Sequence, residues 1–327
     1  MRPFSVVVPE SVDEAVEALA RWGPEARVIA GGTDLVVEMK EEKRAPAVLV
    51  DISRLEELRG VRVEDEGGRA ASRADKPGGA AAGGGVVVWV GALTTHAEVA
   101  SSPTVRAAAP LLADACAHVG SPQIRARGTI GGNLCTASPA GDVIPPLFAL
   151  EASVDVKGSA GVRTIEIESF FAGPKKSALT PDELVLGVRF RALGQGYVSF
   201  FRKLGQRRAL AISVVSVAFV ARLLSPATFE DPRVAFGAVA PTVVRARTVE
   251  RALAGKKLDV AAARHISRLA FRDVMPITDI RGSLAYRREM ACNLLYEGLL
   301  RLTGERDGEG EDRAGGWGGD AEEVGQA

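Results

Sequence analysis

Two glycine-containing turns carry the residues best suited to chemistry in this sequence. The first is Ala30-Gly31-Gly32-Thr33-Asp34, which lies between an expected strand and an expected helix. Adjacent glycines let the backbone adopt φ > 0 and approach a ligand closely, and amide groups at the start of a helix favour an anion. A diphosphate is the group that such a turn suits, although a plain tight turn explains the same residues.

A second turn of this kind lies in the middle of the chain. It reads Gly128-Thr129-Ile130-Gly131-Gly132-Asn133 and is followed by Ser138-Pro139-Ala140-Gly141-Asp142. The hydroxyls of Thr129 and Thr136 offer hydrogen-bond donors, and the Asp142 carboxylate can accept from ribose hydroxyls. This turn alone also fits a structural role. Two such turns in units that face each other would hold an extended dinucleotide.

Other patterns that carry chemistry are absent from the sequence. There is no G-x-x-x-x-G-K-S/T phosphate loop, no G-x-G-x-x-G turn after a strand and no G-x-S-x-G nucleophile elbow. The histidines lie away from any cysteine or carboxylate at metal-ligand spacing, which favours surface or core positions for His96, His118 and His265. The cysteines are odd in number and contain no C-x-x-C pair: Cys116, Cys135 and Cys292. A disulfide framework or a metal centre held by this chain alone is therefore excluded, and its chemistry would come from a cofactor.

Composition predicts a soluble globular protein of two or three domains. The chain has 327 residues, 46% hydrophobic and 25% charged, with a formal net charge of zero, which argues against nucleic acid as the main partner. The longest uncharged apolar run, 209–221, is shorter than the roughly 20 residues of a membrane helix. No secretory signal follows Met1, so a cytoplasmic location is expected.

Two segments are expected to lack a fixed structure. Residues 304–327 hold eight acidic and two basic residues, with many glycines and almost no aliphatic side chains, and are predicted to be a disordered acidic tail. The rest of the chain then carries a mild net charge of +6, which suits anionic ligands. Residues 68–85 are mostly glycine and alanine and are predicted to form a mobile loop.

Hydrophobic periodicity divides the chain before the acidic tail into three units, 1–55, 56–190 and 191–303. Residues 1–55 read as a small α/β unit with strands at 5–8, 27–30 and 47–52 and two helices between them. Residues 56–190 begin with paired strands expected at 61–66 and 86–91, followed by a short helix after Thr95 and a longer helix from Pro103 to Val119. An irregular loop is expected at 121–145, and strands are expected at 151–157, 162–167 and 183–191. The long loop is interpreted as functional because it lies between well-patterned segments.

The last of these units, 191–303, has a different pattern. Long strands at 197–203, 212–224 and 233–240 come first, and helices at 246–254, 259–274 and 283–303 follow. Strands grouped before helices predict a separate α+β domain with an antiparallel sheet and helices on one face.

Taken together, these motifs resemble the FAD-binding subunit of molybdenum hydroxylases. The resemblance rests on Ile29-Ala30-Gly31-Gly32-Thr33-Asp34-Leu35, Thr129-Ile130-Gly131-Gly132-Asn133-Leu134, Ser138-Pro139-Ala140-Gly141-Asp142, Phe236-Gly237-Ala238-Val239-Ala240-Pro241-Thr242 and Gly282-Ser283-Leu284-Ala285-Tyr286-Arg287. The family includes the medium chain of aerobic carbon monoxide dehydrogenase and the flavin subunit of xanthine dehydrogenase. It implies an α+β protein with a two-lobed FAD-binding domain of the vanillyl-alcohol-oxidase/CO-dehydrogenase flavoprotein type, lobes 1–55 and 56–190, and a C-terminal domain over 191–303.

The resemblance also implies which residues contact FAD. Residues Ile29, Ala30, Gly31, Gly32, Thr33, Asp34 and Leu35 should surround the diphosphate, and Thr129, Gly132, Asn133 and Thr136 should complete that site from the second lobe. Asp142 should hold the ribose or adenine end. Leu186 and Lys203 match positions that approach the flavin ring, and Phe201 matches a position at its face.

The function implied is electron transfer within a larger complex. Electrons from a molybdenum cofactor on a large subunit would pass through iron–sulfur clusters of the 2Fe-2S type on a small subunit to this FAD, and then to NAD+, a quinone or another acceptor. A heterotrimer or its dimer is expected. The related 4-hydroxybenzoyl-CoA reductase branch carries a cysteine-rich insert, whereas 68–85 has no cysteine, so that branch is not expected.

Two other functions stay open at this point. One is a self-contained FAD-dependent oxidoreductase of the wider superfamily, which would need its own substrate pocket and catalytic side chain. The other is a nucleotide-binding or assembly protein that has lost redox function. Turnover by the isolated chain would favour the first alternative, and a bound flavin that cannot be reduced would favour the second.

Overall fold

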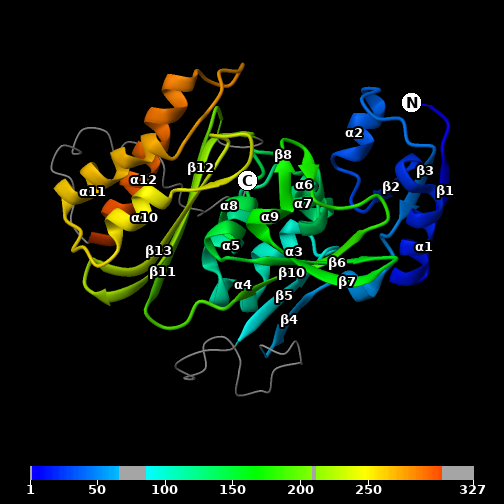
Figure 1. The fold of residues 1–327 in the computed structure, drawn as a ribbon, viewed down its shortest axis with the longest axis horizontal. Helices are drawn as coiled ribbons and strands as arrows, with labels where there is room; N and C mark the ends of the chain where they lie inside the picture. The colour runs from blue at the N-terminus through cyan, green and yellow to red at the C-terminus, as the bar shows by residue number, and fades with distance from the viewer. Residues whose placement is uncertain (1, 66–85, 208–210, 304–327) are drawn as a thin grey trace, which may run out of the picture.

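The computed structural model describes residues 2–65, 86–207 and 211–303. The loop expected at 68–85 and the acidic tail expected at 304–327 lie outside these residues. Figure 1 shows three bodies side by side in chain order, from the blue N-terminal body through the green middle body to the yellow-to-red C-terminal body.

The N-terminal body is a three-stranded parallel sheet in the order β1-β3-β2. Its elements are β1 (Ser5–Val7), α1 (Val12–Trp22), a 3-10 turn (Gly23–Glu25), β2 (Ala26–Ile29), α2 (Leu35–Lys40), β3 (Val48–Asp51) and a second 3-10 turn (Glu56–Leu58). Helix α1 starts at Ser11, whose hydroxyl accepts from the Glu14 amide, and it buries Val16 and Leu19 against the sheet. The first glycine turn follows β2 and leads into α2, as expected from the sequence.

The middle body is a five-stranded antiparallel sheet in the order β4-β5-β10-β6-β7. The strands are β4 (Val61–Glu64), β5 (Val87–Gly91), β6 (Ser153–Gly158), β7 (Gly161–Glu166) and β10 (Leu184–Arg191). Its helices are α3 (His96–Ser101), α4 (Pro103–Ala108), α5 (Pro110–Ala117), α6 (Pro122–Arg127), α7 (Ile130–Thr136), α8 (Ile144–Ala149) and α9 (Ile167–Phe170), and a small ladder joins β8 (Phe171–Gly173) to β9 (Lys176–Ser177). The predicted pairing of the first two strands is confirmed.

Two expectations for the middle body are wrong. The single helix predicted from Pro103 to Val119 is two helices, because Pro110 lacks an amide hydrogen and forces Ala109 out of the helical region, to φ −154° and ψ 67°. The irregular loop predicted over 121–145 contains α6, α7 and the start of α8. Ser121 and Thr129 cap the first two of these helices, which are too short to show a hydrophobic period and depend on tertiary packing.

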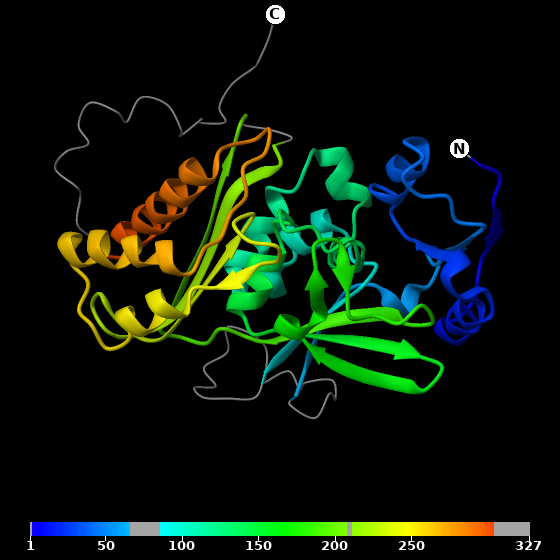
Figure 2. The ribbon, with the colours of Figure 1, turned by 45° about the horizontal axis from the view of Figure 1, so that its top comes forward.

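The C-terminal body is a four-stranded antiparallel sheet in the order β11-β12-β13-β14. The elements are β11 (Tyr197–Gly205), β12 (Ser213–Ser225), β13 (Thr228–Gly237), β14 (Val244–Arg245), α10 (Arg247–Leu253), α11 (Val260–Arg268), a 3-10 turn (Leu269–Arg272) and α12 (Leu284–Thr303). Figure 2 shows the three helices together on one face of the sheet, which confirms the predicted α+β arrangement.

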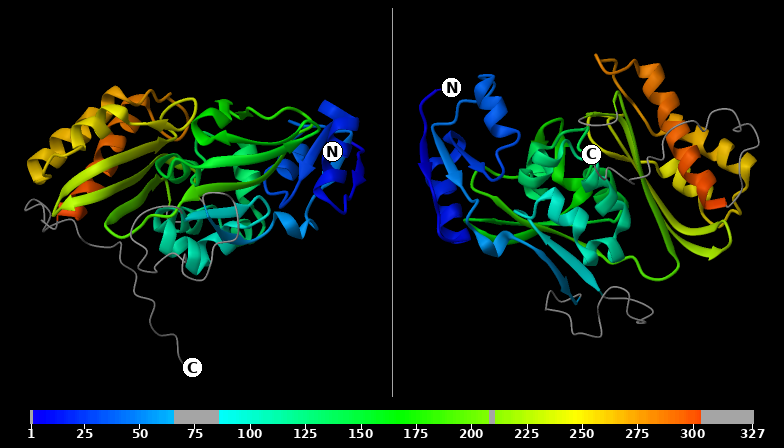
Figure 3. Two further views of the ribbon diagram at one scale, coloured as in Figure 1. Left: turned by 60° about the horizontal axis from the view of Figure 1, so that its bottom comes forward. Right: turned by 180° about the vertical axis from the view of Figure 1, so that it is seen from behind.

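Both faces of this sheet are covered. Phe219 and Phe236 pack with Leu295 of α12 in the core of the C-terminal body, whereas Ala218 and Val220 join the core of the middle body. Figure 3 shows the helix-free face turned toward the helices of the middle body. None of the helices in the described ranges combines the length and apolar character needed to cross a membrane.

Candidate functional site

The fold brings the two glycine turns into direct contact. A Cβ atom on Gly31 would lie 1.8 Å from the carbonyl oxygen of Arg127, so only glycine fits there. A Cβ on Gly128 would lie 3.4 Å from Oγ1 of Thr33, and the Thr136 hydroxyl donates to the Asp34 carboxylate at 3.1 Å. The turns thus meet where the N-terminal and middle bodies touch.

The first turn presents unused amide groups. Across the described part of the chain, the backbone amides of residues 30–35 donate to no backbone or side-chain acceptor. Gly32 adopts φ +73°, a conformation that favours glycine, and Asp34 precedes α2 without capping it. A row of free amides next to a helix start can bind the oxygens of a phosphate group.

The second turn uses its amides differently from the expectation. Three successive amides donate to protein acceptors: Ile130 to the Thr94 carbonyl (3.0 Å), Gly131 to the Ala92 carbonyl (2.9 Å) and Gly132 to the Thr129 hydroxyl (3.1 Å). The first two bonds attach the turn to the residues that follow β5, and the third lies within the turn. The group that this turn can offer a ligand is the side chain of Asn133. Its Oδ1 atom is buried and has no hydrogen-bond partner among the described residues.

Asp142 lies in a buried polar cluster with residues of the C-terminal body. Its Oδ2 accepts from Nζ of Lys203 at 2.5 Å, and its Oδ1 accepts from the Ser213 hydroxyl at 2.5 Å. The Lys203 ammonium also donates to the His118 carbonyl at 3.1 Å. Burial raises the pKa of Asp142, and the ammonium beside it opposes that rise only in part. The structure therefore brings Asp142 and Lys203 together, as a common site requires.

Ser213 is a residue of this cluster that the sequence did not reveal. It opens the apolar strand β12, is completely buried, and belongs to no motif. Only its contact with Asp142, which is far away in the chain, identifies it.

The remaining expected residues lie farther from the cluster. Leu186 is half-buried in β10, and its carbonyl accepts from the Ala92 amide at 2.9 Å, so it is connected to the second turn through Ala92. Phe201 is buried in the core of the middle body, with its ring centroid 6.5 Å from that of His118. The structure therefore places Phe201 in the protein core rather than at an open face.

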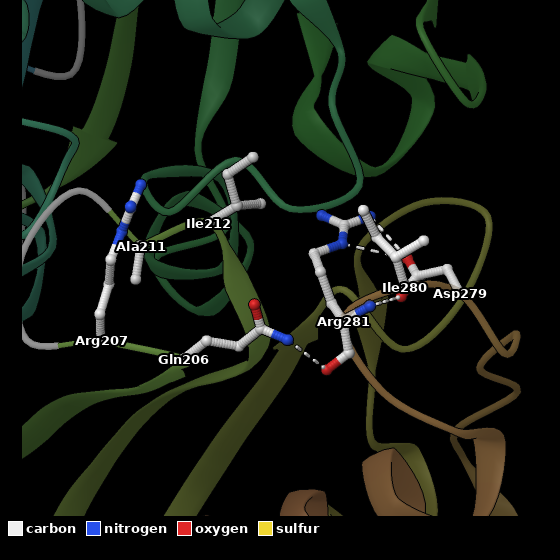
Figure 4. A pocket seen from close by; sticks show the side chains of 7 residues that line it. All are labelled: Gln206, Arg207, Ala211, Ile212, Asp279, Ile280 and Arg281. Carbon is white, nitrogen blue, oxygen red and sulfur yellow. Dashed lines mark hydrogen bonds and ion pairs between the residues drawn. The ribbon is translucent and has the colours of Figure 1, made fainter.

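A cavity of about 610 Å³ is lined by residues that precede Ser213 in the chain and by residues 279–281, and no sequence motif marks it. Its walls are Gln206, Arg207, Ala211, Ile212, Asp279, Ile280 and Arg281 (Figure 4). The Gln206 amide donates to the Arg281 carbonyl at 3.1 Å, and the Arg281 guanidinium pairs with Asp279 at 2.7 Å. No cluster of three or more metal-ligand side chains occurs within the described residues.

Comparison with known proteins gives matches over nearly the whole chain. Residues 2–72 and 82–190 match the family described as the FAD binding domain in molybdopterin dehydrogenase, and residues 200–302 match the CO dehydrogenase flavoprotein C-terminal domain. The carbon monoxide dehydrogenase medium chain of Hydrogenophaga pseudoflava is 33% identical over 296 residues, which cover 90% of this chain and 96% of that one. The nicotinate dehydrogenase FAD-subunit of Eubacterium barkeri is 30% identical over 94% of this chain and 99% of its own length.

Solved structures give the same result. One of them is a carbon monoxide dehydrogenase from Hydrogenophaga pseudoflava that lacks the Mo-pyranopterin moiety of its molybdenum cofactor. A chain of that structure superposes on this one with a TM-score of 0.81 and is 33% identical, and the match covers 91% of this chain and 96% of that chain. Quinoline 2-oxidoreductase from Pseudomonas putida 86 gives a TM-score of 0.81 at 26% identity, covering 93% and 98%. The chain therefore belongs to the family of FAD-binding medium subunits of molybdenum hydroxylases, and it is an oxidoreductase subunit.

Proposed function

We propose that this chain holds one FAD between its two glycine turns and passes electrons through it within a multi-subunit molybdenum hydroxylase. The electrons come from iron–sulfur clusters of a small partner subunit and leave to NAD+, a quinone or another acceptor. The observation that carries the proposal is the contact between the two turns, with free amides on one and the unpartnered Asn133 oxygen beside the other.

The residues present fit a dinucleotide. The free amides of residues 30–35 suit a diphosphate, and the missing side chains of Gly31 and Gly128 keep the two turns close together. In the proposed site the diphosphate lies against Ile29, Ala30, Gly31, Gly32, Thr33, Asp34 and Leu35. From the middle body, Thr129, Gly132, Asn133 and Thr136 complete it. The buried Asn133 oxygen gains a partner when a ligand donates to it, which removes the cost of leaving it unpaired.

Three further residues orient the ligand in this proposal. Asp142 and Lys203 are in direct contact and therefore act at the same part of the ligand, and Leu186 lies toward the flavin ring. FAD supplies the redox chemistry when bound, and the chain supplies binding and orientation. The Lys203 ammonium is fixed by two oxygens, so it provides a positive charge that favours electron-rich groups nearby.

Molybdenum and iron–sulfur centres are assigned to partner subunits. The chain has three cysteines, whereas a cluster of the 2Fe-2S type commonly uses four thiolates. The chain covers 96% of the carbon monoxide dehydrogenase medium chain of Hydrogenophaga pseudoflava, and the solved carbon monoxide dehydrogenase of that organism is described as lacking the Mo-pyranopterin moiety of its molybdenum cofactor. A large molybdenum-cofactor subunit and a small iron–sulfur subunit, in a heterotrimer or its dimer, are the partners that this similarity supports.

A visible absorption spectrum of the purified chain tests the proposal directly. We expect flavin bands without iron–sulfur absorbance, and release of FAD on denaturation. A chain that stays colourless after incubation with excess FAD contradicts the proposal. Turnover of a small organic substrate by the isolated chain would instead indicate a self-contained FAD-dependent oxidoreductase.

A further inference from the structure

Strand β1 is an open sheet edge without the features that normally prevent strands from pairing. It is the outer strand in the order β1-β3-β2. Residues 4–8 contain no charged side chain, and the ladder between β1 and β3 has no bulge. Proteins usually keep exposed edges apart with charges or bulges. The other edge strands of the three larger sheets each carry at least one arginine: β2 (Arg27), β4 (Arg62), β7 (Arg163), β11 (Arg202) and β14 (Arg245).

The backbone of this edge can accept another strand. The Ser5 amide donates to the Ala47 carbonyl at 2.9 Å, which directs the backbone groups of Ser5 toward β3. Because alternate residues of a strand point to opposite edges, the amide and carbonyl of Val6 point away from β3. The amides of Phe4 and Val8, which share this alternation, donate to no backbone acceptor among the described residues.

The prolines that flank the segment leave this edge complete. Pro3 and Pro9 fall at the alternate positions that point toward β3, so their missing amide hydrogens remove no donor from the open edge. A proline also favours an extended backbone at the residue before it, here Arg2 and Val8. The backbone groups of residues 4, 6 and 8 therefore form an uninterrupted row.

The side chains beside this row are apolar and exposed. Phe4, Val6 and Val8 are 38%, 52% and 43% exposed and lie on one face of the strand, because they alternate along it. Val7 points to the other face and packs against the core beneath α1. A strand added at this edge would remove part of the three exposed side chains from water, which favours the addition.

The sequence of the segment is complementary to itself. In an antiparallel pairing of two copies centred on Val6, Phe4 lies opposite Val8 and Arg2 lies opposite Glu10. Arg2 and Glu10 are both exposed, and cross-strand pairs of opposite charge or of an aromatic with a β-branched residue are stabilising. A parallel pairing in register would put Arg2 opposite Arg2. A contact about a two-fold axis requires this kind of self-complementarity, so a second copy of the chain is the occupant that the segment fits.

The position of β1 leaves room for a second copy. Figures 1 and 3 show β1 at the outer margin of the N-terminal body, on the side away from the middle and C-terminal bodies. The first glycine turn follows β2, which lies at the opposite edge of the same sheet. Pairing through β1 therefore does not cover the proposed FAD site.

We propose that β1 pairs with β1 of a second copy of this chain, antiparallel and about a two-fold axis at Val6, so that the two N-terminal sheets become one continuous sheet. Arg2 of each copy then pairs with Glu10 of the other. Pro3 and Pro9 end the pairing on both sides, and a two-fold contact uses both edges, so the assembly closes as a dimer. The contact is short compared with that of an obligate dimer, and we expect a Kd on the order of micromolar.

A charge exchange tests the pairing and its register. Arg2→Glu places two carboxylates opposite each other at both ends of the pairing, and Glu10→Arg places two guanidinium groups there. We expect each variant to raise the Kd of the dimer about tenfold at low ionic strength. The double variant Arg2→Glu/Glu10→Arg should restore the Kd of the unmodified chain, because the ion pairs form again with the charges exchanged. Sedimentation equilibrium of the purified full-length chain measures all four proteins.

A substitution at the centre provides an independent test. Val6→Asp places two carboxylates opposite each other at the two-fold axis and should abolish the dimer. Val162→Asp, at a side chain that is 63% exposed on the edge strand β7, is the matched control and should dimerise as the unmodified chain does. Both side chains are exposed, so both variants should fold and keep their FAD, which the flavin absorbance reports.

Three results would overturn the proposal. A chain that stays monomeric far above micromolar concentration does not pair through β1. A dimer with the same Kd in Arg2→Glu, Glu10→Arg and Val6→Asp uses another surface. A double variant that remains as weak as the single variants contradicts the antiparallel register centred on Val6. The FAD content of the chain is read separately in each case, so loss of the dimer leaves the proposed function standing, and a chain that takes up no FAD contradicts only the proposed function.

Discussion

At the scale of single residues, the absence of a side chain at Gly31 does the most to shape the proposed site. The sequence assigned Gly31, Gly32 and Gly132 to the site without indicating which of them tolerates a side chain least. The structure does: a Cβ at Gly31 meets backbone atoms of Arg127, whereas a Cβ at Gly132 meets only the Thr129 hydroxyl, at 3.1 Å. Backbone atoms cannot move aside cheaply, so Gly31 is the stricter requirement.

Substitution of Gly31 tests the contact between the turns. Gly31→Ala should force the turns apart and lower FAD affinity at least about tenfold, with a loss of stability of roughly 1–3 kcal/mol from overpacking. Gly194→Ala is the control, because a Cβ there meets no heavy atom within 4 Å. FAD binding is measured by titration of the apoprotein. Unchanged affinity in Gly31→Ala would show that the contact does not define the FAD site.

His96 is a second residue whose burial has a measurable consequence. Desolvation, with a smaller contribution from Arg125, lowers its pKa from 6.5 to about 4. The unfolded chain therefore binds a proton at a higher pH than the folded chain does. Stability from this group is present above pH 6.5 and is lost as the pH falls toward 4.

The pH dependence of stability tests this effect. Between pH 7 and pH 5 the free energy of unfolding should fall by roughly 2 kcal/mol on account of His96. His96→Gln should remove that part of the slope, whereas His265→Gln, at an exposed position on α11, should leave it. Urea unfolding at the two pH values provides the comparison. Equal slopes in all three proteins would mean that His96 titrates normally when folded.

At the scale of elements, α12 is attached to the sheet by one buried arginine. Arg287 donates to the carbonyls of Val214 and Ala238 and to the Asp279 carboxylate. Asp279 also accepts from Arg281, and these bonds hold the pKa of that carboxyl well below its usual range although burial opposes them. The helix α12, the strand β12, the residue that follows β13 and the segment 279–281 thus share one polar junction.

Replacing Arg287 should destabilise the protein far more than replacing an arginine at the other end of the same helix. Arg287→Met leaves two carbonyls without this donor and leaves Asp279 with Arg281 as its remaining partner, and we expect a loss of roughly 3 kcal/mol. Arg301→Met removes only an exposed pair with Glu297 and should cost less than about 0.5 kcal/mol. The free energy of unfolding in urea measures both. Similar values for the two variants would contradict a role for the junction.

Element prediction succeeded where local patterning is strong and failed where it is weak. The antiparallel sheet of the C-terminal body follows from long apolar strands, and α1 follows from its cap and its apolar face. The helices α6 and α7 were missed because each is a single cap followed by fewer than two turns. Their signals, Ser121-Pro122 and Thr129, were present in the sequence but insufficient without the packing around them.

At the scale of the whole molecule, ion pairs of Arg245 and Lys203 connect the middle and C-terminal bodies. Arg245 on β14 pairs with Glu250 at 2.6 Å and reaches Glu151 of the middle body at 3.2 Å. Glu250 also accepts from the Val234 amide at 2.9 Å. With the Asp142–Lys203 pair, these contacts fix the C-terminal sheet against the middle body on either side of α8.

Removal of Arg245 should weaken this connection. Arg245→Met removes the shorter of the two ion pairs of the buried Glu250 and leaves only the contact with Arg247 at 3.4 Å, and we expect a loss of roughly 3 kcal/mol in the free energy of unfolding. Arg222→Met is the control, because its partner Glu230 is exposed on the same sheet. Denaturant unfolding measures both variants. A loss in Arg222→Met as large as in Arg245→Met would show that burial of the pair is unimportant.

The sequence by itself determined the family, the two turn motifs and the fold class, because each depends on residues that are close together in the chain. Only the tertiary structure decided that Gly31 lies against Arg127, that Ser213 binds Asp142 and that the Ile130 and Gly131 amides donate to carbonyls just after β5. It also decided that Ile280 remains exposed beside a cavity. The physical reason is that a hydrogen bond or a steric contact depends on which distant backbone comes within about 3 Å, and local sequence does not specify that.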